Sequence, residues 1–382
     1  RMLPLGCLLI LRDSGAAPIP MRPRKEVLLA IVQSSSTSRP RTWHAVVALL
    51  RHDLLKGRHE FLSVLRAIGK RGAWDCALAI LQAMRHARES PDELCHAAAI
   101  KACGTGGRLD HALLLLRAAD RPSTASWGAA IAACAAQGAW EAAVDLLHST
   151  YGARLQPDLA AYSAAISACH RGVKPRLAVR ILHELRAQRL QPDVVAYSAA
   201  ISACEEGWRW RQALKLLAGM QADALSPNVV TCSTAISACE KGRDWPGALW
   251  MLREMEERLL SPNIVSYAAV IRACEKSDAW QRAMDMWQEA QERKLRPSRV
   301  SYAAIIGACA SGSYWQGALG FLAESWEEGG TAPDAISYTA AMTACSRGSA
   351  WESAVWLLED MSRRRVRRDI ICRSIARRAR EA

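Results

Sequence analysis

The sequence predicts an all-α protein, a right-handed α-solenoid of stacked helix-turn-helix repeats. Eight cysteines recur at separations of 31, 35, 35, 35, 35, 35 and 36 residues. Seven tryptophans keep the same period, and each follows its cysteine by six residues where both are present. A fixed period of this length is typical of solenoids, in which each repeat packs only against its neighbours. The residues are Cys103, Cys134, Cys169, Cys204, Cys239, Cys274, Cys309 and Cys345, with Trp74, Trp140, Trp210, Trp245, Trp280, Trp315 and Trp351.

Alignment on these residues divides the chain into nine repeats, each predicted to hold two helices. In one repeat, the apolar residues from Tyr197 to Cys204 share one face of a first helix, and those from Trp210 to Met220 share one face of a second. Pro227 ends this repeat, because proline disfavours the helical conformation in the residue before it. Asn228 is suited to cap the next helix. The repeats are 58–92, 93–123, 124–158, 159–193, 194–228, 229–263, 264–298, 299–334 and 335–369.

The segments outside the repeats are basic. Residues 1–57 carry nine Lys and Arg against three acids, and they are rich in Arg, Ser and Pro, which is typical of an organelle transit segment. A stripe of Trp43, Val46, Val47 and Leu50 also predicts a degenerate half-repeat within this N-terminal extension. The C-terminal residues 370–382 continue an arginine-rich run. We expect them to form a basic capping helix that also contacts phosphate; a phosphate-binding tail and a solvated tail are the alternatives.

Charge within the repeats is balanced overall but unevenly distributed. The first 15 residues of the nine repeats carry 12 basic and 7 acidic residues. If the first helices line the concave face of the solenoid, that face is basic and suits a phosphate backbone. The alternative is that these are ordinary solvated charges.

The periodic cysteines and tryptophans are predicted to be structural. A 35-residue period places one thiol in each layer, without a CxxC motif or a nearby histidine pair, so Cys169, Cys204, Cys239 and Cys274 should be reduced, buried and free of metal. Each tryptophan opens a second helix, where it can pack beneath the preceding turn. The sequence therefore predicts no metal site and no cofactor.

The repeated strings closely resemble the pentatricopeptide repeat. YSAAISAC occurs at 162–169 and again at 197–204, with relatives at 232–239, 267–274 and 338–345. Most repeats end in Pro-Asp or Pro-Asn, as at 192–193 and 227–228. The resemblance is to P-type members, and the Ala-Cys and Trp variant looks like that of algal and other protist proteins. The nearest rival is the tetratricopeptide repeat, a peptide-binding scaffold whose W-x2-L-G-x2-Y signature is absent here.

The resemblance implies that the chain binds single-stranded RNA, one base per repeat. In the family, the residue after the first-helix tyrosine and the last residue of the repeat read the base, and the second residue sandwiches it. Hydroxyl, carboxamide and carboxylate groups are suited to base edges. The pairs carried over are Ser163 with Asp193, Ser198 with Asn228, Ser233 with Asn263, and Thr339 with Asp369. The sandwiching residues are Val195, Val230, Val265, Val300 and Ile336.

The same resemblance implies a sequence preference. Family members run parallel to the RNA, and Ser or Thr favours guanine when paired with Asp and adenine when paired with Asn. The repeats from 159 to 369 should then read 5′-GAANNG-3′, with N for any base. Five repeats lack the hydroxyl and should read weakly or not at all, because they carry Leu62, Ala97, Gly128, Ala268 and Ala303 at that position.

No catalytic motif is present, so the chain is predicted not to be an enzyme. The H-x-E and C-x-x-C deaminase pattern, the Walker loop, GxSxG and HExxH are all absent. We expect an RNA-binding protein of organellar RNA metabolism, chloroplast rather than mitochondrion, that shields, remodels or guides a transcript. Other RNA-processing proteins are possible partners, and no membrane or small-molecule substrate is expected. A tetratricopeptide-like scaffold is the main alternative, and a subunit of a nuclease or editing complex is a third.

Overall fold

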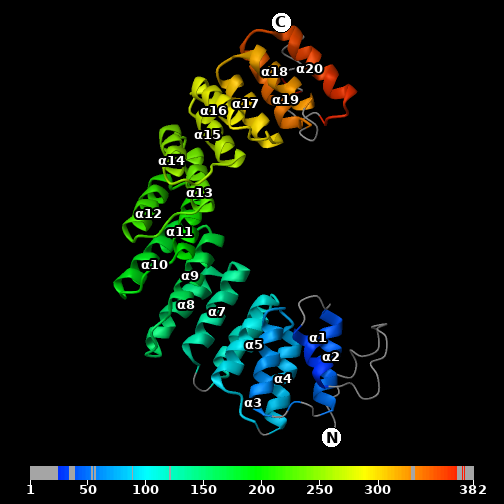
Figure 1. Cartoon of the computed structure of the whole chain (residues 1–382), viewed down its shortest axis with the longest axis vertical. Helices are drawn as coiled ribbons and strands as arrows, with labels where there is room; N and C mark the ends of the chain where they lie inside the picture. Colours follow the sequence, from blue (N-terminus) through cyan, green and yellow to red (C-terminus); the bar gives the residue numbers. More distant parts are fainter. Residues whose placement is uncertain are drawn as a thin grey trace. The chain divides into compact units, whose positions relative to one another are not determined.

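The computed structural model describes residues 25–33, 39–52, 55, 57–87, 89–119, 122–327, 332–367, 372 and 374. These residues form α-helices joined by short turns, and no strand occurs among them (Figure 1). The chain divides into two compact bodies: an N-terminal body of residues 1–172 and 176–192, and a C-terminal body of residues 173–175 and 193–382. The described part of the chain is therefore all-α, as the sequence predicts.

The helices alternate between the first and second helices of successive repeats. The N-terminal body holds α1 (Lys25–Gln33), α2 (Arg39–Arg51), α3 (Arg58–Gly69), α4 (Trp74–His86), α5 (Glu93–Thr105), α6 (Leu109–Arg117), α7 (Thr124–Gln137), α8 (Trp140–Gly152), α9 (Leu159–Arg171) and most of α10 (Pro175–Ala187). The C-terminal body holds α11 (Val194–Glu206), α12 (Trp210–Ala222), α13 (Val229–Lys241), α14 (Trp245–Glu257), α15 (Ile264–Lys276), α16 (Trp280–Glu292), α17 (Arg299–Ser311), α18 (Trp315–Glu327), α19 (Ala335–Arg347) and α20 (Trp351–Arg363).

In the C-terminal body, the first helices make more helix–helix contacts than the second helices. Each of α11, α13, α15, α17 and α19 packs against its own second helix and against the first helix of the adjacent repeat. In the described residues of this body, the second helices pack on first helices, and their backbones do not approach one another. Helix pairs that stack in this order, each against its neighbours, form an α-solenoid.

Tryptophan and glycine fix how consecutive repeats stack. Seven second helices begin at the periodic tryptophans. The ring of Trp210 lies against Gly242 in the turn of the next repeat, where a Cβ would lie 2.0 Å from Trp210 Cδ1. Trp140 meets Gly172 in the same way. These tryptophans therefore pack on the turn of the following repeat, a contact between repeats that the sequence does not predict.

Buried tyrosines join the two helices of a repeat through carboxylates on the second helix or at its C-cap. Tyr197 Oη donates to Asp223, and Tyr338 Oη donates to Asp360 at 2.6 Å. Tyr267 Oη donates to Glu289 Oε1 at 2.9 Å. These bonds hold each first helix at a fixed height on its partner, because a buried hydroxyl that lost its acceptor would be costly.

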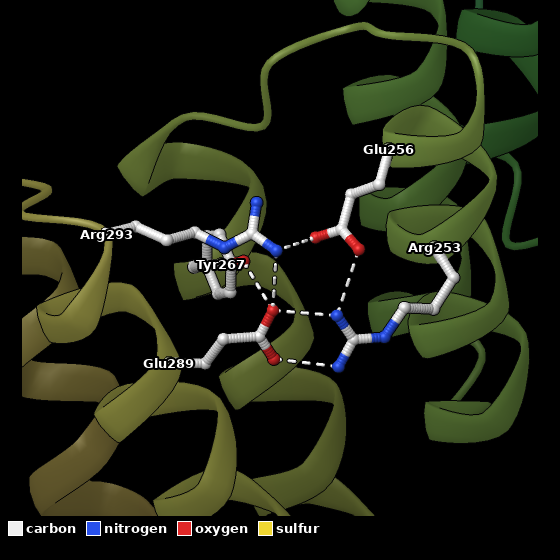
Figure 2. Close-up of polar contacts among 5 residues, drawn as sticks. All are labelled: Arg253, Glu256, Tyr267, Glu289 and Arg293. Carbon is white, nitrogen blue, oxygen red and sulfur yellow. Dashed lines mark hydrogen bonds and ion pairs between the residues drawn. The ribbon is translucent and has the colours of Figure 1, made fainter.

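The carboxylate of Glu289 also ties two repeats together (Figure 2). Arg253 on α14 makes two bonds of 2.7 Å to the two Glu289 oxygens, which is the bidentate geometry of a strong ion pair. Arg293 bonds to both Glu289 and Glu256, and Glu256 bonds back to Arg253. Hydrogen bonding from Arg253 and Tyr267 lowers the pKa of Glu289. The network therefore links α14 and α16, whose backbones are apart.

All cysteines of the described residues are buried and outside disulfides. Burial raises the pKa of Cys169, Cys204 and Cys274 to about 11 and that of Cys239 to about 12. No group of three or more His, Cys, Asp or Glu in the described part of the chain is placed to hold a metal ion. The thiols thus pack as small apolar side chains.

Two helices precede the first predicted repeat, where the sequence predicts a half-repeat. α1 packs on α2 and α3, and α2 also packs on α4. Val46 is buried as predicted, whereas Trp43, Val47 and Leu50 are only half-buried. The predicted stripe lies on a second helix, and α1 is its first helix. Residues 1–24 of the predicted transit segment lie outside the described residues.

The predicted basic C-terminal helix 370–382 also lies outside the described residues, except for Cys372 and Ser374. Cys372 is buried against α19 and α20, where its thiol contacts Thr339 and Met361. Among the described helices, none combines the length and apolar character that crossing a bilayer requires.

Candidate nucleic-acid interface

The predicted sandwiching residues form a series of exposed apolar side chains. Each is the second residue of its first helix, and each is between 56% and 69% exposed. Aliphatic side chains this exposed at the same position of five consecutive repeats are not needed for the core, so they are available to a ligand. The series consists of Val195, Val230, Val265, Val300 and Ile336.

Where the structure describes the end of a repeat, its last residue is the N-cap of the following first helix. Asp193 Oδ1 accepts from the backbone N–H of Ala196 at 2.8 Å, and Asn228 Oδ1 accepts from that of Thr231 at 2.8 Å. Asn263 Oδ1 accepts from Ser266 N at 3.0 Å. Capping uses one terminal atom of the side chain and leaves the other, Oδ2 in aspartate or Nδ2 in asparagine, without a role in the cap.

In each of two predicted base-reading pairs, the hydroxyl of a third residue connects the two members. Ser198 Oγ lies 2.9 Å from Thr231 Oγ1, which donates to Asn228 Oδ1 at 2.8 Å. Ser198 and Asn228 are therefore connected through one side chain, although they are 30 residues apart in the sequence.

The next repeat shows the same arrangement. Ser233 Oγ lies 3.0 Å from Ser266 Oγ, which donates to Asn263 Oδ1 at 3.2 Å. Sequence reasoning missed Thr231 and Ser266. The signal that could have found them is a hydroxyl three residues after the cap, a position whose backbone N–H already binds the cap side chain.

The structure does not place the two members of either remaining predicted pair relative to each other. Ser163 is 8% exposed on α9 of the N-terminal body, whereas Asp193 caps α11 of the C-terminal body. Thr339 Oγ1 donates to the Ala335 carbonyl at 2.6 Å, which is the local bonding that helical threonines commonly make. Its predicted partner, Asp369, lies outside the described residues.

The repeats predicted to read weakly differ from one another at the cap. Ser298 and Ser301 form a closed capping box, in which each side chain bonds the backbone N–H of the other. Asp334 instead caps α19 through Oδ1, with Ser337 donating from both N and Oγ. The repeat with Ala268 thus ends in a serine whose hydroxyl bonds within its own cap, whereas the repeat with Ala303 retains a carboxylate.

Charges at the ends of the first helices pair between repeats. Lys241 lies 3.1 Å from Glu205, and both Arg272 and Lys276 contact Glu240, at 3.0 and 2.9 Å. Part of the basic excess that the sequence places on the first helices is therefore neutralised by neighbouring carboxylates.

Glu275 occupies the next position of this series. Its neighbour in the next repeat differs, because that repeat has Gly307 and Ser311 at the positions that Arg272 and Lys276 occupy in the repeat of Glu275. A Cβ at Gly307 would lie 2.4 Å from Glu275 Oε1, so the carboxylate is packed against α17. Burial there raises the pKa of Glu275 to about 7.

Comparison with known proteins agrees with this architecture. The family model described as "Pentatricopeptide repeat domain" matches residues 145–206, 215–277 and 251–311, and the model described as "PPR repeat" matches residues 336–366. No curated protein matches the chain by sequence.

Two solved structures of the pentatricopeptide repeat protein PPR10, both in complex with RNA, share the fold. PPR10 in complex with an 18-nucleotide psaJ RNA element aligns with a TM-score of 0.73 and 17% identity, over 91% of this chain and 51% of that one. A variant with three cysteines changed to serine, in complex with the same element, aligns with the same values. PPR10 from maize aligns with a TM-score of 0.47 and 19% identity, over 93% of this chain and 65% of that one. This chain spans about half the length of the two PPR10 chains in the RNA complexes.

The fold and the interface define the class of protein as an α-solenoid of helix pairs that carries one cap and one exposed apolar residue per layer. The matching sequence profiles and the shared fold then place the chain in the pentatricopeptide repeat family. Both matching sequence profiles describe the pentatricopeptide repeat, which favours this family over the tetratricopeptide scaffold.

Proposed function

We propose that this chain binds single-stranded RNA and reads one base per repeat. The observation that carries the proposal is the joining of Ser198 to Asn228, and of Ser233 to Asn263, beside exposed valines at the N-terminal ends of consecutive first helices. Each repeat thus offers an apolar side chain for the face of a base and a polar pair for its edge, which is how unstacked bases are recognised. The RNA-bound PPR10 structures support the proposal through the shared fold.

The proposed preference is 5′-GAANNG-3′, with N-terminal repeats toward the 5′ end. An asparagine whose Oδ1 caps a helix has N–H groups left to donate, which suits adenine N1. An aspartate in the same position carries only acceptor oxygens, which suits guanine N1–H. The two central adenines are assigned to the pairs that end in Asn228 and Asn263, and the first guanine to the pair that ends in Asp193.

The proposed role is occupancy of an organellar transcript. A solenoid that covers a run of bases shields it from nucleases, prevents it from pairing or presents it to another factor, and none of these roles needs a catalytic group. The basic, serine-rich N-terminal segment supports an organellar location, with the chloroplast as the first compartment to test.

The test is binding to three RNA oligonucleotides, GAANNG, GGGNNG and CUUNNC, at fixed moderate salt. Low salt would hide base discrimination behind phosphate contacts. We expect GAANNG to bind most tightly, by about tenfold or more, since each mismatched base leaves a polar group unpaired at a cost of about 1 kcal/mol. Equal affinity for all three would reject base reading.

A further inference from the structure

A buried hydroxyl connects the two members of each central reading pair. Thr231 and Ser266 are the third residues of α13 and α15, and they are 1% and 0% exposed. Each side chain touches the serine of the preceding repeat and the asparagine that caps its own helix. Neither residue belongs to the predicted reading pairs.

The direction of these hydrogen bonds follows from the chemistry of the groups. Asn228 Oδ1 is a carbonyl oxygen and can only accept, so Thr231 donates its single hydroxyl proton to it. In the 2.9 Å contact between Ser198 and Thr231, the remaining donor is then Ser198. With its proton committed to Thr231, Ser198 Oγ offers only lone pairs to a ligand.

The asparagine is fixed in the same way. Asn228 Oδ1 accepts two bonds from Thr231, one from the backbone N–H and one from the hydroxyl, each 2.8 Å long. The carboxamide is therefore held with Oδ1 toward the helix, and its Nδ2 group, with two N–H donors, is turned away from it. Together, Ser198 presents an acceptor and Asn228 presents a donor.

We infer that Thr231 and Ser266 are specificity-determining positioning residues, which set the reading pair to an acceptor on the serine and a donor on the asparagine. Adenine has the complementary edge, with N6–H as donor and N1 as acceptor, and cytosine has the same order at N4–H and N3. Guanine and uracil reverse it, with a carbonyl oxygen beside an N–H. The inference rests on the proposed function, and it assigns the rejection of keto bases to a residue outside the pair.

Other repeats contain natural variations of this arrangement. The third residues of α9 and α11 are Ala161 and Ala196, which carry no hydroxyl. Ser337 bonds to Asp334, but the residue preceding it in the series is Ala303. Within the described repeats, the complete serine–hydroxyl–asparagine relay occurs in the two that are proposed to read adenine.

The test changes Thr231 to valine, which keeps the shape of the side chain and the backbone N–H that is capped. Ser198 would then be able to rotate its hydroxyl and donate to a keto oxygen. Binding is measured for GXANNG, with A, G, C or U at X, and for GAXNNG, with the same four bases at X. The wild-type chain, Thr231→Val, Thr231→Ser and Thr234→Val are compared at one salt concentration, with circular dichroism melting of each. Thr234 is the matched control, because it is an exposed threonine on the same helix that donates to the Val230 carbonyl.

We expect Thr231→Val to reduce the preference for A over G at the second base by about 5- to 10-fold, the equivalent of one hydrogen bond. The third base should keep its preference, and Thr231→Ser and Thr234→Val should behave as wild type. A folded Thr231→Val protein with the wild-type preference at the second base overturns the inference. Loss of preference at both bases alike overturns it too, because a general loss of order would then be the cause. A wild-type chain without preference at either base instead rejects the proposed function.

Discussion

Exchange of asparagine for aspartate at two caps is expected to change the RNA that is bound. In Asn228→Asp and Asn263→Asp, the retained Oδ1 keeps the bonds from Thr231 and Ser266, so both helices stay capped. The only atomic change is at the outer position, where an amide donor becomes a carboxylate acceptor. Adenine N1 would then face another acceptor, while guanine N1–H would gain one.

The size of the effect follows from the bonds that are exchanged. One donor is lost toward adenine and one acceptor is gained toward guanine, each worth about 1 kcal/mol. Each substitution should therefore shift the preference for A over G by about 2 kcal/mol, or about 30-fold. The two caps share no hydrogen-bond partner in the structure, so their effects should add.

The assay is competition between GAANNG and GGGNNG for the wild-type chain, each single variant and the double variant. Asn228→Asp should act on the second base and Asn263→Asp on the third. Melting temperatures within a few degrees of wild type would show that the caps are intact. A folded double variant that still prefers GAANNG as strongly as wild type would refute the reasoning.

Four further predictions concern the scaffold. Gly242→Ala should destabilise the protein by about 1–3 kcal/mol in urea unfolding, because its Cβ would overlap Trp210. Gly320→Ala is the control: it has open space around it and should be neutral or stabilising. Equal effects of the two substitutions would contradict the packing. Glu289→Gln should lower stability by about 1–3 kcal/mol at pH 7. Because the pKa of Glu289 is lowered from 4.5, the difference in stability between variant and wild type should fade as the pH falls below 4.5. A difference that stays constant with pH would contradict the ion pairs. Glu275→Gln should raise stability by about 3 kcal/mol above pH 7, because the folded state favours the protonated acid, and this advantage should be lost toward pH 4.5. An effect that does not vary between these pH values would contradict the burial of Glu275. Thiol reagents at pH 8 should label Cys204 and Cys239 only after denaturation, because burial holds their pKa near 11 and 12; labelling of the native protein would contradict this.

The sequence predicts the fold well because the same pattern recurs in nine predicted repeats. A single amphipathic pattern is ambiguous, but periodic tryptophans and Pro-Asp or Pro-Asn endings place most second-helix starts and most caps at residues that the structure also uses. What the sequence could not show is which repeat each tryptophan touches. The contact between Trp210 and Gly242 joins residues of different repeats, so the pattern within a single repeat does not reveal it.

The candidate site was predictable only as far as the resemblance reached. The exposed valines and the capping role of Asn228 follow from their positions, but Thr231 and Ser266 do not stand out in a sequence rich in serine and threonine. Their role depends on a first helix lying beside that of the preceding repeat, so that one hydroxyl meets the side chains of both. Glu275 was missed for a similar reason, because its burial depends on the absence of a side chain at Gly307 in the next repeat.

Capping and base reading are performed by the same residue, and the first task fixes the chemistry of the second. A cap must turn an acceptor toward the helix N-terminus, so the atom that remains is a donor in asparagine and an acceptor in aspartate. The choice between these two residues therefore costs the scaffold little while it inverts the hydrogen-bonding character presented outward. A hydroxyl at the third helical position extends this control to the neighbouring serine by occupying its proton. Base preference in such an array can thus change one repeat at a time, because the buried cysteines and tyrosines and the tryptophans packed between repeats are not involved.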